Sequence, residues 1–295
     1  MKRLSFRTLL YWLAPTAGVG TLAGQARTPA VAGVSVDTVS GIRSRFLPET
    51  PMVRVFLPAG YAGSDARYPV LYANDGQDME AVGLARTIDS LVAAGRMHPV
   101  LVVAVHAGAD RLQSYGTADQ PNAQGLGAQA RSYERFMVEE LIPAVEHRYR
   151  TLPGATIMGW SLGGLSAFDL AWRNQNTFRQ VGVFSGSFWW RTDDSTTAAK
   201  QSSRIMHRRV RESVRPRRLR AWFEVGRQDE KDDRDMNGVI DAIQDTRELM
   251  EAMLENGMRE GRDLAYVEVD GGHNVETWGT VLPQFLVWAF GRVAG

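Results

Sequence analysis

The chain has 295 residues, of which 44% are hydrophobic, so it is long and apolar enough to build a sizeable core. Its 34 lysines and arginines nearly balance its 33 aspartates and glutamates, which argues against a nucleic-acid ligand held by phosphate contacts. Cysteine is absent, and this excludes disulfides, thiolate nucleophiles and cysteine-type zinc sites.

Residues 1–26 have the pattern of an export signal. A basic start over residues 2–7 precedes an interrupted apolar stretch over residues 9–22, and small residues lead to a cleavage point after Ala26. No other run approaches transmembrane length. We therefore expect an exported protein, secreted or in a bacterial periplasm, with a frayed N-terminal extension as the alternative interpretation of residues 1–26. Its mature part, residues 27–295, is expected to be a single domain without stable membrane insertion.

Extended and helical patterns alternate from about Val34 onward. Strands are predicted over residues 52–61, 68–75, 98–108, 155–160, 178–187, 219–226 and 264–272, and helices over residues 81–97, 132–150, 162–172, 238–257 and 277–293. Continuous apolar strands of this kind are typical of a parallel sheet covered on both faces. The pattern predicts an α/β fold with a doubly wound, mostly parallel sheet and helices on both faces.

Residues 191–220 are polar and weakly periodic, and they form either an inserted helical cap or a helix on the sheet. Eight arginines lie between positions 204 and 220. Blocks of charge usually face solvent, so we expect these arginines on a solvated helix face, with His207 at the surface beside them.

The segment Gly159-Trp160-Ser161-Leu162-Gly163 matches the pattern G-x-S-x-G between a predicted strand and a predicted helix. Such a turn strains the serine backbone, and its glycines leave room for the neighbouring strand and helix. Ser161 Oγ would then project above the sheet edge as a nucleophile. The alternative is a glycine-rich strand–helix turn with an incidental serine.

A serine hydroxyl needs a base, and the chain has five histidines. His147 and His207 lie in charged segments, and His98 precedes a strand at the wrong sheet edge. His106 is at the right edge but comes before the serine in the chain. His273 follows the last predicted strand, after two glycines, and agrees with the chain order serine, acid, histidine. We therefore expect His273 to be the catalytic base.

The acid should follow the strand that lies between the serine and the histidine. Asp229 is there, three residues after the strand's final glycine, and Glu230 is the substitute. Oxyanion-hole donors are expected from the backbone N–H of Leu162 and from the loop after residues 68–75, with Gln77 as the second donor. That loop is otherwise an ordinary tight turn.

Four stretches carry a family resemblance: "YPVLYANDGQDM", "AQARSYERFMVEELIPAVEHRYRT", "IMGWSLGGLSAF" and "VDGGHNVETW". Together they resemble the branch of the α/β-hydrolase superfamily that includes siderophore (enterochelin) esterases, feruloyl and acetyl-xylan esterases, S-formylglutathione hydrolases and mycolyltransferases. The resemblance covers about residues 34–293 and is greatest to the siderophore-esterase-like members. It implies an α/β-hydrolase fold with Ser161, His273 and an acid near Asp229 as a catalytic triad. Some of those members use a serine–histidine pair with no clear acid, so a dyad is the alternative.

Residues 233–244 allow two interpretations. Asp233, Asp235, Asn237 and Asp241 have the spacing of a Ca²⁺-binding loop, but Gln244 stands where a bidentate carboxylate is expected. The competing interpretation is a helix start, with Asp235 or Asn237 as N-cap and Asp241 in the first turn. No other cofactor is expected.

The sequence therefore predicts a serine esterase that cleaves a small-molecule ester through an acyl-enzyme. Trp160, Tyr115, Trp189 and Trp190 are the candidate substrate-binding residues, with core packing as the alternative for the aromatic run after residue 187. Acyl transfer from the same site and a non-catalytic carbohydrate- or ligand-binding protein are the alternative functions.

Overall fold

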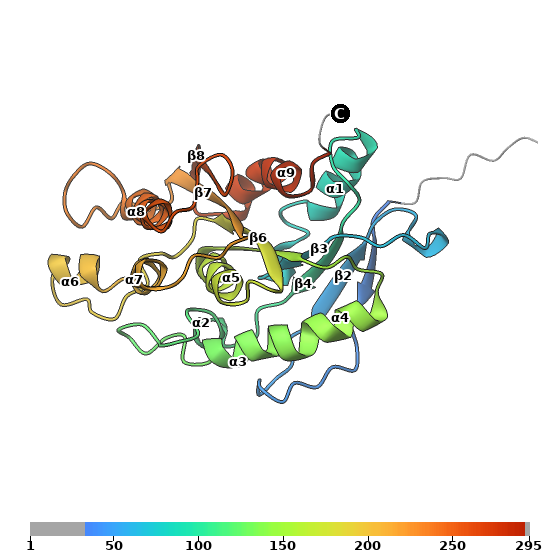
Figure 1. The fold of residues 1–295 in the computed structure, drawn as a ribbon, viewed down its shortest axis with the longest axis horizontal. Coiled ribbons are helices and arrows are strands. Elements are labelled where there is room, and N and C mark those ends of the chain that lie inside the picture. Colours follow the sequence, from blue (N-terminus) through green and yellow to red (C-terminus); the bar gives the residue numbers. More distant parts are fainter. Residues whose placement is uncertain (1–32, 293–295) are drawn as a thin grey trace, which may run out of the picture. The chain divides into compact units, whose positions relative to one another are not determined.

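The computed structural model describes residues 33–292. Within this range the chain forms an eight-stranded sheet in the order β1-β2-β4-β3-β5-β6-β7-β8 (Figure 1). Its strands are β1 (Ser35–Thr38), β2 (Val53–Leu57), β3 (Val70–Ala73), β4 (Leu101–Val105), β5 (Ala155–Trp160), β6 (Phe178–Phe184), β7 (Arg220–Gln228) and β8 (Leu264–Gly272). The pair β1–β2 and the pair β2–β4 are antiparallel, and every other pair is parallel. The predicted mostly parallel sheet is confirmed. The export signal predicted over residues 1–26 lies outside the described residues.

The strand β1 was not predicted from the sequence. It has four residues, and most of them are exposed, so no apolar alternation marks it. It occupies one edge of the sheet, and β8 occupies the other, where it pairs with β7 alone. The strand β5 lies inside the sheet between β3 and β6.

Helices cover both faces of the sheet, as predicted (Figure 1). The helices α1 and α9 pack on one face, and α3, α4, α5, α7 and α8 contribute to the core on the other. The longer helices are α1 (Leu84–Ala93), α4 (Ile142–Arg148), α5 (Ser161–Arg173), α7 (Ile205–Glu212), α8 (Asp241–Glu255) and α9 (Val275–Phe290). Short helices are η1 (Tyr61–Gly63), η2 (Gly76–Asp78), α2 (Arg111–Ser114), α3 (Ala130–Arg135) and α6 (Thr197–Ser202). In the part of the chain described, no helix has the length and apolarity needed to cross a bilayer.

The helix predicted over residues 132–150 is interrupted by the π-helical turn η3 (Phe136–Leu141), between α3 and α4. Pro143 follows directly, near the start of α4. Proline has no N–H to donate and its ring crowds the carbonyl four residues earlier, here that of Glu139. A widened turn before Pro143 relieves that crowding.

Two predictions about the arginine-rich segment are wrong. Arg204 is 2% exposed and pairs with Asp245 and Glu248 of α8, and His207 is 1% exposed with Nε2 2.8 Å from the Asp245 carbonyl oxygen. Burial lowers the pKa of His207 to about 3, so the imidazole is neutral. These partners lie about 40 residues away, beyond any local pattern. Other arginines of the segment, at 208, 211, 217 and 218, are exposed as expected.

Candidate active site

Ser161 occupies the sharp turn between β5 and α5. Its φ is 55°, in the left-handed region that L-residues with side chains rarely adopt. The turn is closed by glycines, because a Cβ at Gly159 would overlap the Gly163 carbonyl and a Cβ at Gly163 would overlap Asp75 Oδ2. Ser161 is half-buried at the carboxyl end of β5 and at the first position of α5. This is the backbone geometry expected of an exposed nucleophile on a strand–helix turn.

The loop after β3 packs directly against the start of α5. Asn74 Nδ2 donates to the Gly163 carbonyl oxygen at 2.8 Å, and the Tyr133 hydroxyl donates to Asn74 Oδ1 at 2.6 Å. Among residues 33–292, the backbone N–H groups of Leu162 and Gln77 have no hydrogen-bond acceptor. The Gln77 side chain is engaged, since its Oε1 accepts from the Ala107 N–H at 3.0 Å. The two predicted oxyanion donors are thus unpaired N–H groups within the described residues, one in η2 and one in the first turn of α5.

Asp75 fixes the shape of that loop. It has a φ of 55°, and Arg111 binds its carboxylate in a bidentate pair with N–O distances of 2.7 and 2.9 Å. The Tyr115 hydroxyl accepts from the Asp75 N–H at 3.1 Å. A charge-assisted bidentate pair holds a carboxylate in one orientation. Arg111 and Tyr115 therefore stabilise the backbone that presents the Gln77 N–H.

The candidate acid and base lie at the carboxyl ends of β7 and β8. His273 Nδ1 is 3.8 Å from Asp229 Oδ2. The Asp229 side chain is 1% exposed, and that of His273 is 38% exposed. The chain turns back after β7, with the Asp229 N–H donating to the Gly226 carbonyl at 3.2 Å. The His273 ring contacts the edge of the Trp278 indole at a centroid distance of 5.3 Å.

Glu230, the substitute acid, has another partner. Its Oε1 accepts from the Ala242 N–H at 2.6 Å, in the first turn of α8. A carboxylate there satisfies an N–H group that has no partner within the helix. Burial, together with the charges of Asp241 and Asp232, raises the pKa of Glu230 to about 7. The structure therefore places Asp229, and not Glu230, against the histidine.

A second buried carboxyl lies near Asp229. Glu224 of β7 is 0% exposed, and neither of its carboxyl oxygens has a hydrogen-bond partner within residues 33–292. Burial and the charge of Asp229 raise the pKa of Glu224 to about 8. The sequence motifs described above do not include this residue. Its signal was a charged residue inside the apolar run "AWFEV".

The acidic segment of residues 233–244 is closed by donors from the protein. Asp233 accepts from the N–H groups of Asn237 and Gly238 at 3.0 and 2.8 Å. Arg234, whose side chain is 4% exposed, binds Asp241 at 3.1 Å and Asp245 at 2.6 Å. The guanidinium thus pairs with Asp241, one residue of the calcium interpretation, and with Asp245 outside it.

The helix-start interpretation of this segment is correct only in part. The residue that flanks α8 is Ile240, so the prediction of Asp235 or Asn237 as N-cap is wrong, although Asp241 does lie in the first turn. In the described part of the chain, no three histidine, aspartate or glutamate side chains are placed to hold one metal ion.

Comparison with known proteins identifies the family. The model of the esterase family, described as "Putative esterase", matches residues 44–289. The chain belongs to this esterase family. The endo-1,4-beta-xylanase/feruloyl esterase of Xylanibacter ruminicola is 29% identical over 146 residues, 45% of this chain and 19% of that protein. Esterase Rv1288 of Mycobacterium tuberculosis is 30% identical over 152 residues, 48% of this chain and 30% of that protein. The chain thus matches less than a third of the length of each of these two relatives.

Solved structures agree in fold with this family member. A ferulic acid esterase superimposes with a TM-score of 0.67 at 24% identity, covering 87% of this chain and 97% of the other. The enterobactin esterase FES from Shigella flexneri gives 0.66 at 18% identity, covering 87% of this chain and 59% of the other. The predicted α/β-hydrolase fold is confirmed.

The predicted substrate-binding aromatics of the esterase-family chain have different positions. Trp160 and Trp190 are 2% and 1% exposed and belong to the core, which corrects the expectation that their side chains bind substrate. Trp160 instead stacks on Trp278 and donates from Nε1 to Asp78 at 3.0 Å. Trp189 is 37% exposed and lines a small cavity of about 30 Å³ with Asp229 and His273.

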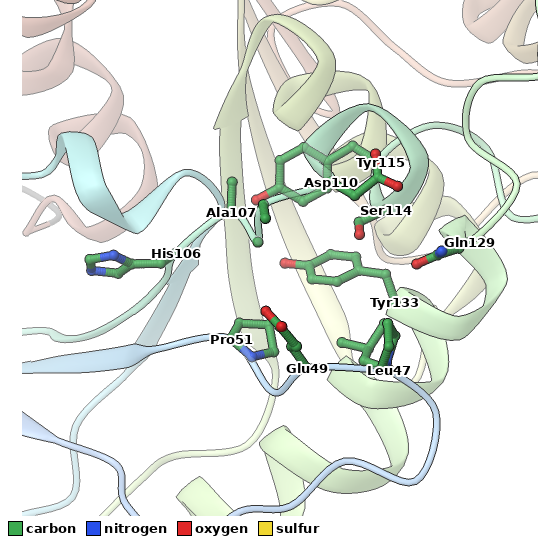
Figure 2. Close-up of a pocket in the computed structure, with 13 residues that line it drawn as sticks. Leu47, Glu49, Pro51, His106, Ala107, Asp110, Ser114, Tyr115, Gln129 and Tyr133 are labelled. Carbon is green, nitrogen blue, oxygen red and sulfur yellow. The ribbon is translucent and has the colours of Figure 1, made fainter.

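A larger cavity of about 240 Å³ opens beside the loop after β3 (Figure 2). Its walls come from residues 47–51, from the segment 106–115 after β4, and from α3. Tyr115 and Tyr133, whose hydroxyls contact Asp75 and Asn74 of that loop, line the cavity together with the carboxylate-bearing Glu49 and Asp110. No lysine or arginine is among the residues that line it, so its local charge is negative.

Proposed function

We propose that the protein hydrolyses carboxylic esters through an acyl-enzyme formed on Ser161. His273 takes the hydroxyl proton as Oγ attacks the ester carbonyl, and it returns the proton to the leaving alcohol. It then activates a water molecule that releases the acid. Asp229 orients the imidazole and stabilises its protonated form. The N–H groups of Leu162 and Gln77 stabilise the tetrahedral oxyanion.

The observation that carries this proposal is the strained turn at Ser161 with an unpaired N–H directly after it. A non-glycine residue at φ 55° costs about 1–3 kcal/mol and persists only when the surroundings demand it. Glycines at 159 and 163 and the Asn74 side chain enforce it here. The 3.8 Å approach of Asp229 to His273 supports the same assignment. Closing that gap to hydrogen-bond distance requires only a small shift, as catalytic contacts often tighten when substrate binds.

The cavity beside Tyr115 is the proposed site for one part of the ester. It adjoins the oxyanion loop, because Ala107 in its wall donates to Gln77. The strand β4 leads into the cavity and β5 leads into Ser161, and β3 lies between them. With neighbouring strands ~4.8 Å apart, the ends of β4 and β5 are separated by about 10 Å. An ester whose carbonyl carbon lies at Ser161 can therefore place a medium-sized substituent in the cavity. The names of the matched relatives make feruloyl and other aryl esters the first substrates to screen.

The test is hydrolysis of p-nitrophenyl acetate and butyrate by the wild type and by Ser161→Ala, His273→Ala and Asp229→Asn. Loss of the nucleophile or the base should lower kcat by at least about 10³-fold, and Asp229→Asn by up to about 10⁴-fold. His147→Ala is the matched control, because His147 is exposed on α4 and should leave kcat unchanged. Equal activity of the wild type and the Ser161 and His273 variants would contradict the proposal.

A further inference from the structure

The triad acid lacks the donors that a buried carboxylate requires. Asp229 is 1% exposed, and neither of its carboxylate oxygens has a hydrogen-bond partner within residues 33–292. Oδ2 faces His273 Nδ1 at 3.8 Å, which leaves Oδ1 to be satisfied by another group. An isolated buried carboxylate is strongly unfavourable unless it is paired or hydrogen-bonded. Oδ1 therefore requires a donor, and a protonated side chain beside it would supply one.

Glu224 is the group placed to supply it. Alternate residues of a strand point to the same face, so Glu224 and Gly226 of β7 share one face of the sheet. A Cβ built on Gly226 would lie 2.5 Å from Asp229 Oδ1, so that oxygen lies over this face, next along the strand from Glu224. Both Glu224 oxygens also lack a partner in the described chain. One proton held between the two groups would give Asp229 Oδ1 a donor and would join it to one Glu224 oxygen.

We propose that Glu224 stays protonated at neutral pH and donates a hydrogen bond to Asp229, so that it positions the carboxylate that faces His273. This proposal rests on the proposed function, in which Asp229 is the triad acid. Glu224 touches no substrate and is a positioning residue.

The surroundings of Glu224 favour the neutral form. Its cross-strand neighbours are Phe184 on β6 and Val267 on β8, both apolar. The helix α9 presents Trp278 and Phe285 to the same apolar cluster. Asp229 is the charged group that acts on Glu224, with His273 beyond it. Burial first, and then the Asp229 charge, raise the pKa of Glu224 to about 8, in agreement with the geometry.

The experiment compares Glu224→Gln and Glu224→Leu with the wild type on p-nitrophenyl acetate between pH 5.5 and pH 10. The glutamine amide keeps a donor, so kcat/KM at pH 7 should stay within about 3-fold of wild type, whereas leucine should lower it about 10- to 100-fold by leaving a charged acceptor unpaired. Wild-type kcat/KM should decline near pH 8, as Glu224 ionises beside Asp229, and the glutamine variant should lack that decline.

Asp169→Asn is the matched control. Asp169 is 2% exposed in α5, its pKa is raised to about 7 by burial, and its Oδ2 accepts from the Ala118 N–H at 2.9 Å. It has no contact with Asp229 or His273, so its variant should keep the alkaline decline. An alkaline decline retained in Glu224→Gln, or wild-type kinetics in a folded Glu224→Leu, would overturn the proposal.

Urea unfolding gives a readout that does not depend on esterase activity. A pKa raised above the unfolded value of 4.5 stabilises the fold at low pH, and this contribution is lost as pH rises through about 8. The wild type should therefore lose stability between these values, and Glu224→Gln should lose less. If the wild type hydrolyses no ester, the proposed function fails on its own, while the urea series still decides the protonation of Glu224.

Discussion

Replacing Arg234 by methionine should destabilise the protein strongly. The guanidinium is 4% exposed and contacts Asp245 at 2.6 Å, Asp241 at 3.1 Å and Gln201 Oε1 at 2.7 Å. Removing one partner of a buried ion pair costs about 3–5 kcal/mol, because the other charge stays buried without compensation. Asp245 keeps Arg204 as a second partner, so we expect about 3 kcal/mol, at the lower end of that range.

Thermal unfolding followed by circular dichroism measures this effect. For a domain of this size, 1 kcal/mol corresponds to about 2–4 °C, so Arg234→Met should lower Tm by about 6–12 °C. Esterase activity should also fall, because the loop between Asp229 and α8 loses its internal cation. Arg217→Met is the matched control, since Arg217 is exposed and should shift Tm by no more than about 2 °C. If both variants unfold together, the buried network does not hold the loop and the reasoning fails.

Three further outcomes follow from the structure. Gly163→Ala should abolish turnover of p-nitrophenyl acetate, because the added Cβ overlaps Asp75 Oδ2; unchanged kcat would mean that the turn does not need this approach. Because Glu49 and Asp110 line the cavity, esters that carry a carboxylate should have a kcat/KM about 5-fold lower than neutral isosteres. A Glu49→Gln/Asp110→Asn variant should bring the two kcat/KM values closer together, and an unchanged difference would contradict the role of these carboxylates. Added Ca²⁺ should leave Tm within about 1 °C of that of an EDTA-treated sample, because protein N–H groups already bind the Asp233 carboxylate. A marked rise in Tm would support the calcium interpretation.

The candidate nucleophile was the easiest part of the site to predict, because all its determinants are local. Strand, glycines, serine and helix stand within one short stretch, and the structure places Ser161 in that turn. The candidate base and acid could be selected by chain order, and the structure brings His273 and Asp229 together.

What the sequence did not reveal depends on partners far along the chain. Arg204 and His207 looked like surface residues because their segment is basic, yet α8 buries both. Trp190 was predicted to bind substrate because it follows a strand, yet its side chain packs against Gly116 and Gly127. Composition cannot distinguish a solvated charge from one that a distant helix has paired.

The two ends of the proposed proton relay rest on strands with different support. The serine's strand, β5, is held by neighbours on both sides, whereas the histidine follows β8, which has a neighbour on one side only. Edge segments open locally at lower free energy than interior strands. Mild warming should therefore disconnect the base before it disturbs the nucleophile, so that heat inactivation precedes global unfolding. For engineering, β8 is accordingly the strand at which a cross-link or a covering segment would extend working lifetime without altering the chemistry.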